Sequence, residues 1–211
     1  MWEPDFPAFR PVQFFNLTLT CNPLPSKEDG ASFPDYALPA TGWLTHETIF
    51  ADCAMGWHQE GLKFQILVKK PLEKSIYPHL TKGDAVELFL DTRDMKSARI
   101  PTRFCHHFFF LPQAVEEVQR GELSRFRGED SHSLCDPEQL VCDTRQVPEG
   151  YLMQLFLPSE VLCGYDPAQF NRIGFTYRIS RFGGNPQHFS VVSPDFSIEQ
   201  NPSLWASLKL S

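Results

Sequence analysis

Six polar side chains occupy alternate positions in aromatic and aliphatic segments of this 211-residue chain. If Leu62, Phe64, Leu88 and Phe108 face a core, the residues between them face the opposite side of their strands. Carboxylate, guanidinium, imidazole and amide groups on neighbouring strands could together bind hydroxyl groups or a carboxylate. The same pattern also fits a solvated sheet face with cross-strand ion pairs. The six side chains are Gln65, Glu87, Arg103, His107, Gln154 and Arg178.

Tryptophans beside such a surface would add stacking area for a sugar ring. Trp57 lies at the end of an expected hairpin and completes the set of candidate ligand-binding residues. Trp43, in an irregular segment, could serve in the same way. Trp205 lies inside the last expected strand, where we expect it to belong to the core.

The run Cys105, His106 and His107 could suggest a metal site or a Cys–His pair. Successive side chains of a strand point to opposite faces, so Cys105 and His107 share one face while His106 faces the core as a packing residue. We expect no metal here, because a zinc site would need ligands from elsewhere in the chain. Candidates for those ligands are His79, His132 and Cys135.

Asp91 and Asp94 end another expected strand and could help to ligate calcium, but the sequence identifies no further oxygen ligands, so we expect a solvated turn. Carboxylate pairs for glycoside hydrolysis could be drawn from Glu87, Asp91 and Glu160, as from any sequence with 26 acidic residues. No nucleotide-binding, nucleophile-elbow or metalloprotease motif occurs. We therefore expect neither an enzyme nor a cofactor.

The elements that would position these residues are mostly strands. Period-two alternation, Phe-rich segments and scattered prolines predict an all-β fold with strands at 12–20, 48–57, 61–70, 85–91, 103–111, 151–157, 173–181, 189–192 and 204–210. Residues 158–162 predict one helical turn. The 113–149 segment is interpreted as an insertion with a short amphipathic helix at 114–120. These elements predict a single domain over residues 1–211, an antiparallel, jelly-roll-like β-sandwich of about nine or ten strands.

Composition excludes several function classes. Nineteen Lys and Arg against 26 Asp and Glu give a net charge of −7 without a basic run, which argues against a nucleic-acid partner. The sequence contains no run of about 18 apolar residues, so it predicts no membrane-spanning helix. The N-terminus carries acids and prolines in place of a secretory signal, and the six cysteines form no C-x-x-C pair. We therefore expect a cytoplasmic protein with reduced thiols.

Several segments resemble a family 9 carbohydrate-binding module, within the wider group of DOMON-like β-sandwiches. The most specific is Gly-Asp-Ala-Val-Glu-Leu-Phe-Leu-Asp at 83–91, and further matching segments lie at 55–64, 150–158, 172–179 and 204–208. The chain is divergent, because its 173–175 strand continues into residues 180–185 where family members often carry an acidic stretch. The resemblance implies a non-catalytic β-sandwich that binds carbohydrate or a sugar-like ligand. The alternative is an intracellular protein-interaction or structural module that keeps the fold and contacts a protein partner through its edges and the 113–149 segment.

Overall fold

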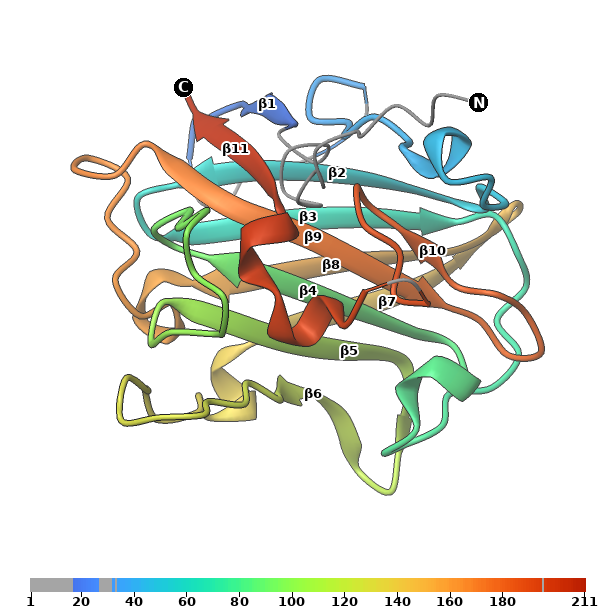
Figure 1. Ribbon diagram of the computed structural model, residues 1–211. Coiled ribbons are helices and arrows are strands. Elements are labelled where there is room, and N and C mark those ends of the chain that lie inside the picture. Colours follow the sequence, from blue (N-terminus) through green and yellow to red (C-terminus); the bar gives the residue numbers. More distant parts are fainter. Residues whose placement is uncertain (1–16, 27–31, 33, 195) are drawn as a thin grey trace, which may run out of the picture.

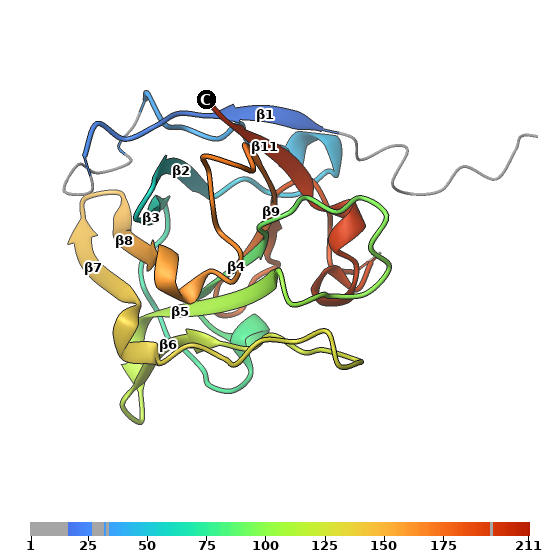
Figure 2. The same ribbon diagram turned by 90° about the vertical axis from the view of Figure 1, so that its left-hand side faces the viewer.

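The computed structural model describes residues 17–26, 32, 34–194 and 196–211 (Figure 1). Within these residues the chain forms eleven strands and short 3-10 helices, with no α-helix. The described residues contain no helix that is long and apolar enough to cross a membrane. The strands form two sheets that pack face to face, as Figure 2 shows from the side. The predicted all-β sandwich is confirmed.

The larger sheet has the strand order β1-β11-β9-β4-β5-β6, and β10 pairs with β9. β1 and β11 run parallel, whereas the other pairs in this sheet are antiparallel. Its strands are β1 (Thr18–Cys21), β4 (Ala85–Asp91), β5 (Cys105–Val115), β6 (Val118–Glu122), β9 (Arg172–Ser180), β10 (Gln187–His188) and β11 (Ala206–Leu210).

The smaller sheet is antiparallel, with the order β2-β3-β8-β7. Its strands are β2 (Ala51–His58), β3 (Gly61–Val68), β7 (Val141–Val147) and β8 (Gly150–Pro158). The two-residue turn between β2 and β3 needs glycine at position 61, where φ is 144° and a Cβ would come within 2.2 Å of the Leu157 carbonyl oxygen. The hairpin predicted from the sequence is therefore confirmed.

Alternation along the strands builds the core between the sheets. Leu62, Phe64 and Ile66 of β3 are buried there together with Val86 and Leu88 of β4. Apolar burial on this scale supplies the main favourable free energy of folding.

The outer face of the larger sheet is covered as well, which the sequence pattern did not predict. The chain between β10 and β11 folds back over this face with the 3-10 helices η6 (Ile198–Gln200) and η7 (Pro202–Leu204), drawn in red in Figure 1. Ile198 and Trp205 pack there against Phe89 of β4 and Cys105 of β5. Trp205 is therefore a core residue, as predicted, and β4 is buried on both faces.

The predicted helix at 114–120 is wrong. β5 runs on to Val115, Glu116 and Glu117 form a two-residue turn, and β6 starts at Val118. Both turn residues have positive φ, 50° and 69°, as a type I′ hairpin turn requires. Pairing with β5 thus overrides the local helical preference of this segment.

Other boundaries differ less. The 113–149 segment supplies β6 to the larger sheet and β7 to the smaller one. The predicted helical turn at 158–162 is confirmed as the 3-10 helix η5 (Ser159–Val161). The strand expected at 189–192 is replaced by β10, just before it, and residues 12–16 of the first expected strand lie outside the described residues.

Candidate functional site

The structure divides the sequence-predicted polar residues between the two sheets. Glu87 on β4, His107 on β5 and Arg178 on β9 share the outer side of the larger sheet. Gln65 on β3 and Gln154 on β8 are register partners in the smaller sheet, facing away from the core. The expected single surface is therefore wrong, because the strands that carry the two glutamines belong to the other layer.

Glu87, His107 and Arg178 form a buried hydrogen-bonded group. Arg178 donates from Nε to Oε2 of Glu87 and from Nη2 to Oε1, each at 2.7 Å. His107 Nε2 lies 3.0 Å from the same Oε1, and its ring stacks on Phe89 with centroids 4.2 Å apart. Arg178 also reaches Oε1 of Glu199 at 2.8 Å, so one guanidinium holds two carboxylates.

The charge state of Glu87 follows from these contacts. Burial raises the pKa of the Glu87 carboxyl, but hydrogen bonds from His107 and Arg178, together with their charge, outweigh burial and lower the pKa to about 2. Glu87 is therefore a fixed anion near neutral pH. Because a general acid must carry a proton at working pH, this carboxyl is unsuited to that role.

A pocket of about 630 Å³ opens above this group, on the outer side of β5. Its volume suits a small ligand such as a sugar of one or two rings. Cys105 and His107 of β5 and the buried Trp205 line it beside the chain that follows β6 and the η6 helix. The polar and aromatic side chains that these two segments contribute are Ser124, Arg125, Phe126, Arg127, Ser197, Glu199 and Gln200.

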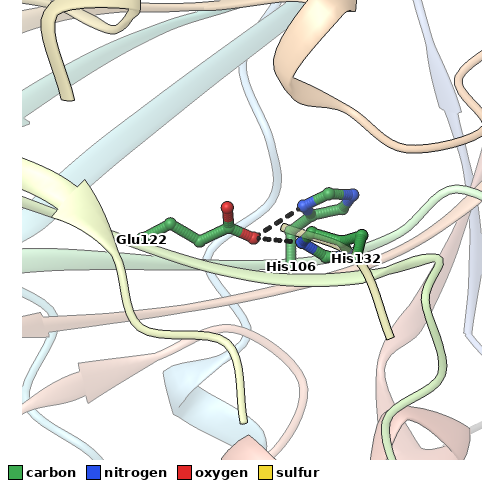
Figure 3. Close-up of side chains that lie close together, drawn as sticks. All are labelled: His106, Glu122 and His132. Atoms are coloured by element: carbon green, nitrogen blue, oxygen red, sulfur yellow. Dashed lines mark hydrogen bonds and ion pairs between the residues drawn. The ribbon is translucent and has the colours of Figure 1, made fainter. Parts of the chain in front are cut away.

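One wall of the pocket is anchored by a second buried carboxylate, Glu122 at the end of β6 (Figure 3). Its Oε1 lies 2.8 Å from Nδ1 of His106 and 2.8 Å from Nε2 of His132, and it accepts a hydrogen bond from Ser124. Its Oε2 accepts from the Cys135 backbone N–H at 2.9 Å. Glu122 therefore ties β5, β6 and the chain after β6 together.

The hydrogen-bond partners fix the protonation of both histidines. His132 lies between two acceptors, Glu122 and the Arg103 carbonyl oxygen, so both of its nitrogens donate and the ring is an imidazolium. Burial lowers the pKa of His132, but the hydrogen bond and charge of Glu122 outweigh it and raise the pKa above 6.5. His106 accepts the Cys163 backbone N–H at Nε2, so it is neutral with its proton on Nδ1, and burial lowers its pKa.

His106, Glu122 and His132 are also a candidate metal-ligand set, because their ligand atoms lie within 4.8 Å of one another. A metal on Nδ1 of His106 would move the ring proton to Nε2, where the Cys163 N–H already points at 3.0 Å. A metal-bound histidine needs an acceptor at that position. The arrangement fits a hydrogen-bonded cluster better than a metal centre, and sequence analysis had grouped His132 with Cys105 and His107 instead.

Trp57 and Arg103 are held by other parts of the chain. The Trp57 indole N–H donates to the Cys21 carbonyl oxygen at 3.0 Å, and the partly buried ring packs against the core. Arg103 is exposed and pairs with Asp130 at 2.6 Å. Trp43 in the 3-10 helix η2 (Gly42–Leu44) is 68 % exposed.

The expected solvated turn at Asp91 and Asp94 is wrong, because Asp91 is buried. Its carboxylate accepts the backbone N–H groups of Arg93 and Met95, at 2.9 and 2.7 Å, and so closes the turn after β4. Asp94 pairs with Lys96 and accepts a hydrogen bond from Ser207. Protein donors thus already occupy carboxylate oxygens that a calcium ion would use.

A Ser–His–Glu arrangement lies apart from the pocket residues. Nδ1 of His188 is 2.6 Å from Glu47, and Nε2 is 2.7 Å from the Ser193 hydroxyl. A serine nucleophile also needs backbone N–H groups for the oxyanion. The Ser193 N–H points at His188, and the next residue, Pro194, has none. The arrangement therefore fits a loop anchor better than a hydrolytic triad.

Sequence reasoning missed most of the residues around the pocket. Arg125 and Arg127 alternate with Phe126 after a strand, which is a signal that could have identified them. No local signal identifies Glu122 or Glu199, because their histidine and arginine partners are brought to them by strand pairing and tertiary packing.

No protein-family model and no curated protein sequence matches this chain. Solved structures are similar to it. A family 9 carbohydrate-binding module from Caldicellulosiruptor kristjanssonii in complex with cellotriose has a TM-score of 0.65 at 16 % identity, over 92 % of this chain and 93 % of that chain. A family 9 carbohydrate-binding module from the same organism in complex with glucose has a TM-score of 0.63 at 16 % identity, over 92 % of this chain and 95 % of that chain. A proposed carbohydrate-binding protein from Bacteroides uniformis has a TM-score of 0.54 at 8 % identity, over 92 % of this chain and 99 % of that chain.

The chain therefore has the fold of a family 9 carbohydrate-binding module, and the resemblance drawn from its sequence segments is confirmed at the level of the fold.

Proposed function

We propose that this chain binds carbohydrate, without chemical conversion, in the pocket lined by His107, Glu199 and Gln200. The pocket itself carries the proposal: it places the hydrogen-bonding side chains of His107, Glu199 and Gln200 beside the partly exposed ring of Phe126. Sugars are recognised by such combinations of polar groups and aromatic surface. The fold supports the proposal, since two structures that share it hold cellotriose and glucose.

A non-catalytic role is supported by the state of the carboxylates near the pocket. Arg178 pairs with both Glu87 and Glu199, and the pKa of Glu87 is held at about 2. Glycoside hydrolysis needs one carboxyl that stays protonated as an acid and a second as base or nucleophile. We further propose a reducing, cytoplasmic location, which the six free cysteines support.

Titration of isotope-labelled protein with glucose and cellotriose, followed by NMR, tests the binding proposal. We expect shifted amides around His107 and Gln200, and roughly fivefold weaker binding by Gln200→Ala, as for the loss of one hydrogen bond. Gln154→Ala, on the outer side of the smaller sheet, is the matched control. Shifts confined to Gln65, Gln154 and Trp57 would move the site to that sheet. Absence of binding on a broad glycan array would favour the protein-interaction alternative.

A further inference from the structure

Two arginines line the pocket on the side of the chain that follows β6. Arg125 and Arg127 are both exposed, and they flank Phe126 in the irregular chain after β6. Leu123, two residues before Arg125, packs on the outer side of the larger sheet beside Phe109. Leu123, Arg125 and Arg127 all line the pocket, so this segment presents its two arginines there.

Neither guanidinium has a hydrogen bond or ion pair with any residue that the structure describes. Arginines nearby differ: Arg103 pairs with Asp130, and Arg120 with Glu138. In a chain with a net charge of −7, two adjacent unpaired cations at a pocket are an unusual local excess of positive charge. Because like charges repel, nothing in this pair itself holds the two arginines beside the pocket.

The chain that carries the two arginines is anchored by Glu122 and His132. Ser124 donates to Glu122 at 2.7 Å, and the Phe126 ring packs edge-on against His132 with centroids 4.8 Å apart. The residues that alternate with the two arginines are thus anchored to a buried carboxylate and its imidazolium. The backbone that carries both arginines beside the pocket is therefore held in place by buried partners.

The opposite wall offers groups for hydroxyls and no further free charge. Glu199 is committed to Arg178 at 2.8 Å, so its negative charge is already paired. Gln200 and Ser197 line the pocket beside it. His107 uses Nε2 toward Glu87, which leaves Nδ1 as the ring atom available to a ligand hydroxyl.

We propose that the ligand of this pocket is a sugar bearing an anionic group, a carboxylate or a phosphate, with that group between Arg125 and Arg127 and its hydroxyls against the η6 wall. Guanidinium groups suit both anions, because paired N–H donors match their oxygens and the hydrogen bonds are charge-assisted. This inference rests on the proposed carbohydrate-binding function and adds the chemical class of the sugar.

Calorimetric titration with D-glucose, D-glucuronate, D-glucose 6-phosphate and inorganic phosphate tests the proposal. We expect at least one anionic sugar to bind tenfold or more tightly than glucose, with an affinity that falls as salt is added. The two sugar arms distinguish a carboxylate from a phosphate ligand. The Arg125→Gln/Arg127→Gln variant should bind the anionic sugar within about twofold of glucose.

The matched control is Arg145→Gln/Lys209→Gln, which removes the same charge from exposed positions on β7 and β11 and should keep the preference. Equal binding of glucose and both anionic sugars, or a preference that survives Arg125→Gln/Arg127→Gln, would overturn the inference and leave the proposed function intact. Inorganic phosphate binding as tightly as glucose 6-phosphate would show an anion site that ignores the sugar, which also overturns the inference. If no sugar of either kind binds, the proposed function fails together with it.

Discussion

Arg178, on the outer side of the larger sheet, is the cation that pairs with both Glu87 and Glu199. Arg178→Met would leave Glu87 buried without its cation, so we expect the free energy of unfolding to fall by about 3 to 5 kcal/mol. Chemical denaturation measures this loss. The Glu87→Met/Arg178→Met variant should lose less than Arg178→Met alone, since no charge is then stranded. Exposed Arg145→Met is the control, and a loss from Arg178→Met no larger than the control's would contradict the interpretation.

His132 gives the protein a pH dependence of predictable sign. Its pKa is raised above 6.5. Its contribution to the free energy of unfolding is therefore complete below pH 6.5 and is lost as pH rises through the folded-state pKa. The pKa of Glu122 is lowered below 4.5: burial raises it, and the hydrogen bonds from His106 and His132 more than offset burial. Its contribution is therefore lost only as pH falls below 4.5.

We accordingly expect His132→Asn to lower the free energy of unfolding most, by about 2 kcal/mol, between pH 4.5 and 6.5. The difference between this variant and the unsubstituted protein should shrink steadily above pH 6.5. Urea denaturation at a series of pH values measures it, with the exposed His79→Asn as control. A cost in free energy of unfolding that is constant from pH 5 to 9 would show that His132 is not the carboxylate-paired cation described above.

At the residue scale, the sequence predicted which side chains lie close together only where those side chains belong to regular strands. Strand alternation placed Glu87, His107 and Arg178 on one side, and the observed register brought them into contact. Glu122 escaped prediction, and His132 was considered only as a metal ligand, because nine residues of irregular chain separate the two and only tertiary packing brings His106 to both.

At the scale of elements, the β5–β6 hairpin carries an avoidable strain. Glu116 and Glu117 have φ of 50° and 69°, which costs an L-residue other than glycine about 1 kcal/mol or more. Glu116→Asn/Glu117→Gly supplies the pair that type I′ turns favour, so we expect about 1 kcal/mol of added stability. Thermal unfolding measures the gain. The reverse kind of change, Glu116→Pro, should destabilise, because proline cannot adopt positive φ; if both variants unfold alike, the turn assignment is wrong.

The same hairpin shows where sequence interpretation fails. Ala114, Glu117 and Gln119 favour a helix in isolation, and no glycine or asparagine marks the turn. Residues 85–91, by contrast, were predicted with the observed bounds because their alternation agrees with their partners on both sides. Local preference predicts an element when tertiary pairing agrees with it, and it is wrong when pairing overrides it.

For the whole molecule, the two outer faces of the sandwich differ in a way that places the pocket. The sequence predicted an open polar face, either ligand-binding or solvated, but η6, η7 and the chain after β6 cover the larger sheet and build walls above β5. The covering residues 196–203 have no regular period, and the sequence predicted strands rather than walls on either side of them. The fold class was predictable from pattern, whereas the pocket depends on irregular chain.

The two sheets are held to each other by aromatic contacts that a mutant cycle can measure. Phe64 of β3 and Phe175 of β9 come from different sheets and stack with ring centroids 5.7 Å apart. We expect Phe64→Leu and Phe175→Leu each to lower the free energy of unfolding by about 1 to 2 kcal/mol. The double variant should lose less than the sum by about 0.5 to 1.5 kcal/mol, which is the energy of the aromatic pair itself.

The control is Phe156→Leu on β8, whose ring lies on the outer side beside Lys63. This substitution should lower the free energy of unfolding by less, and its effect should add independently to that of Phe175→Leu. Strict additivity of the Phe64 and Phe175 substitutions would mean that these rings do not contact each other between the two sheets.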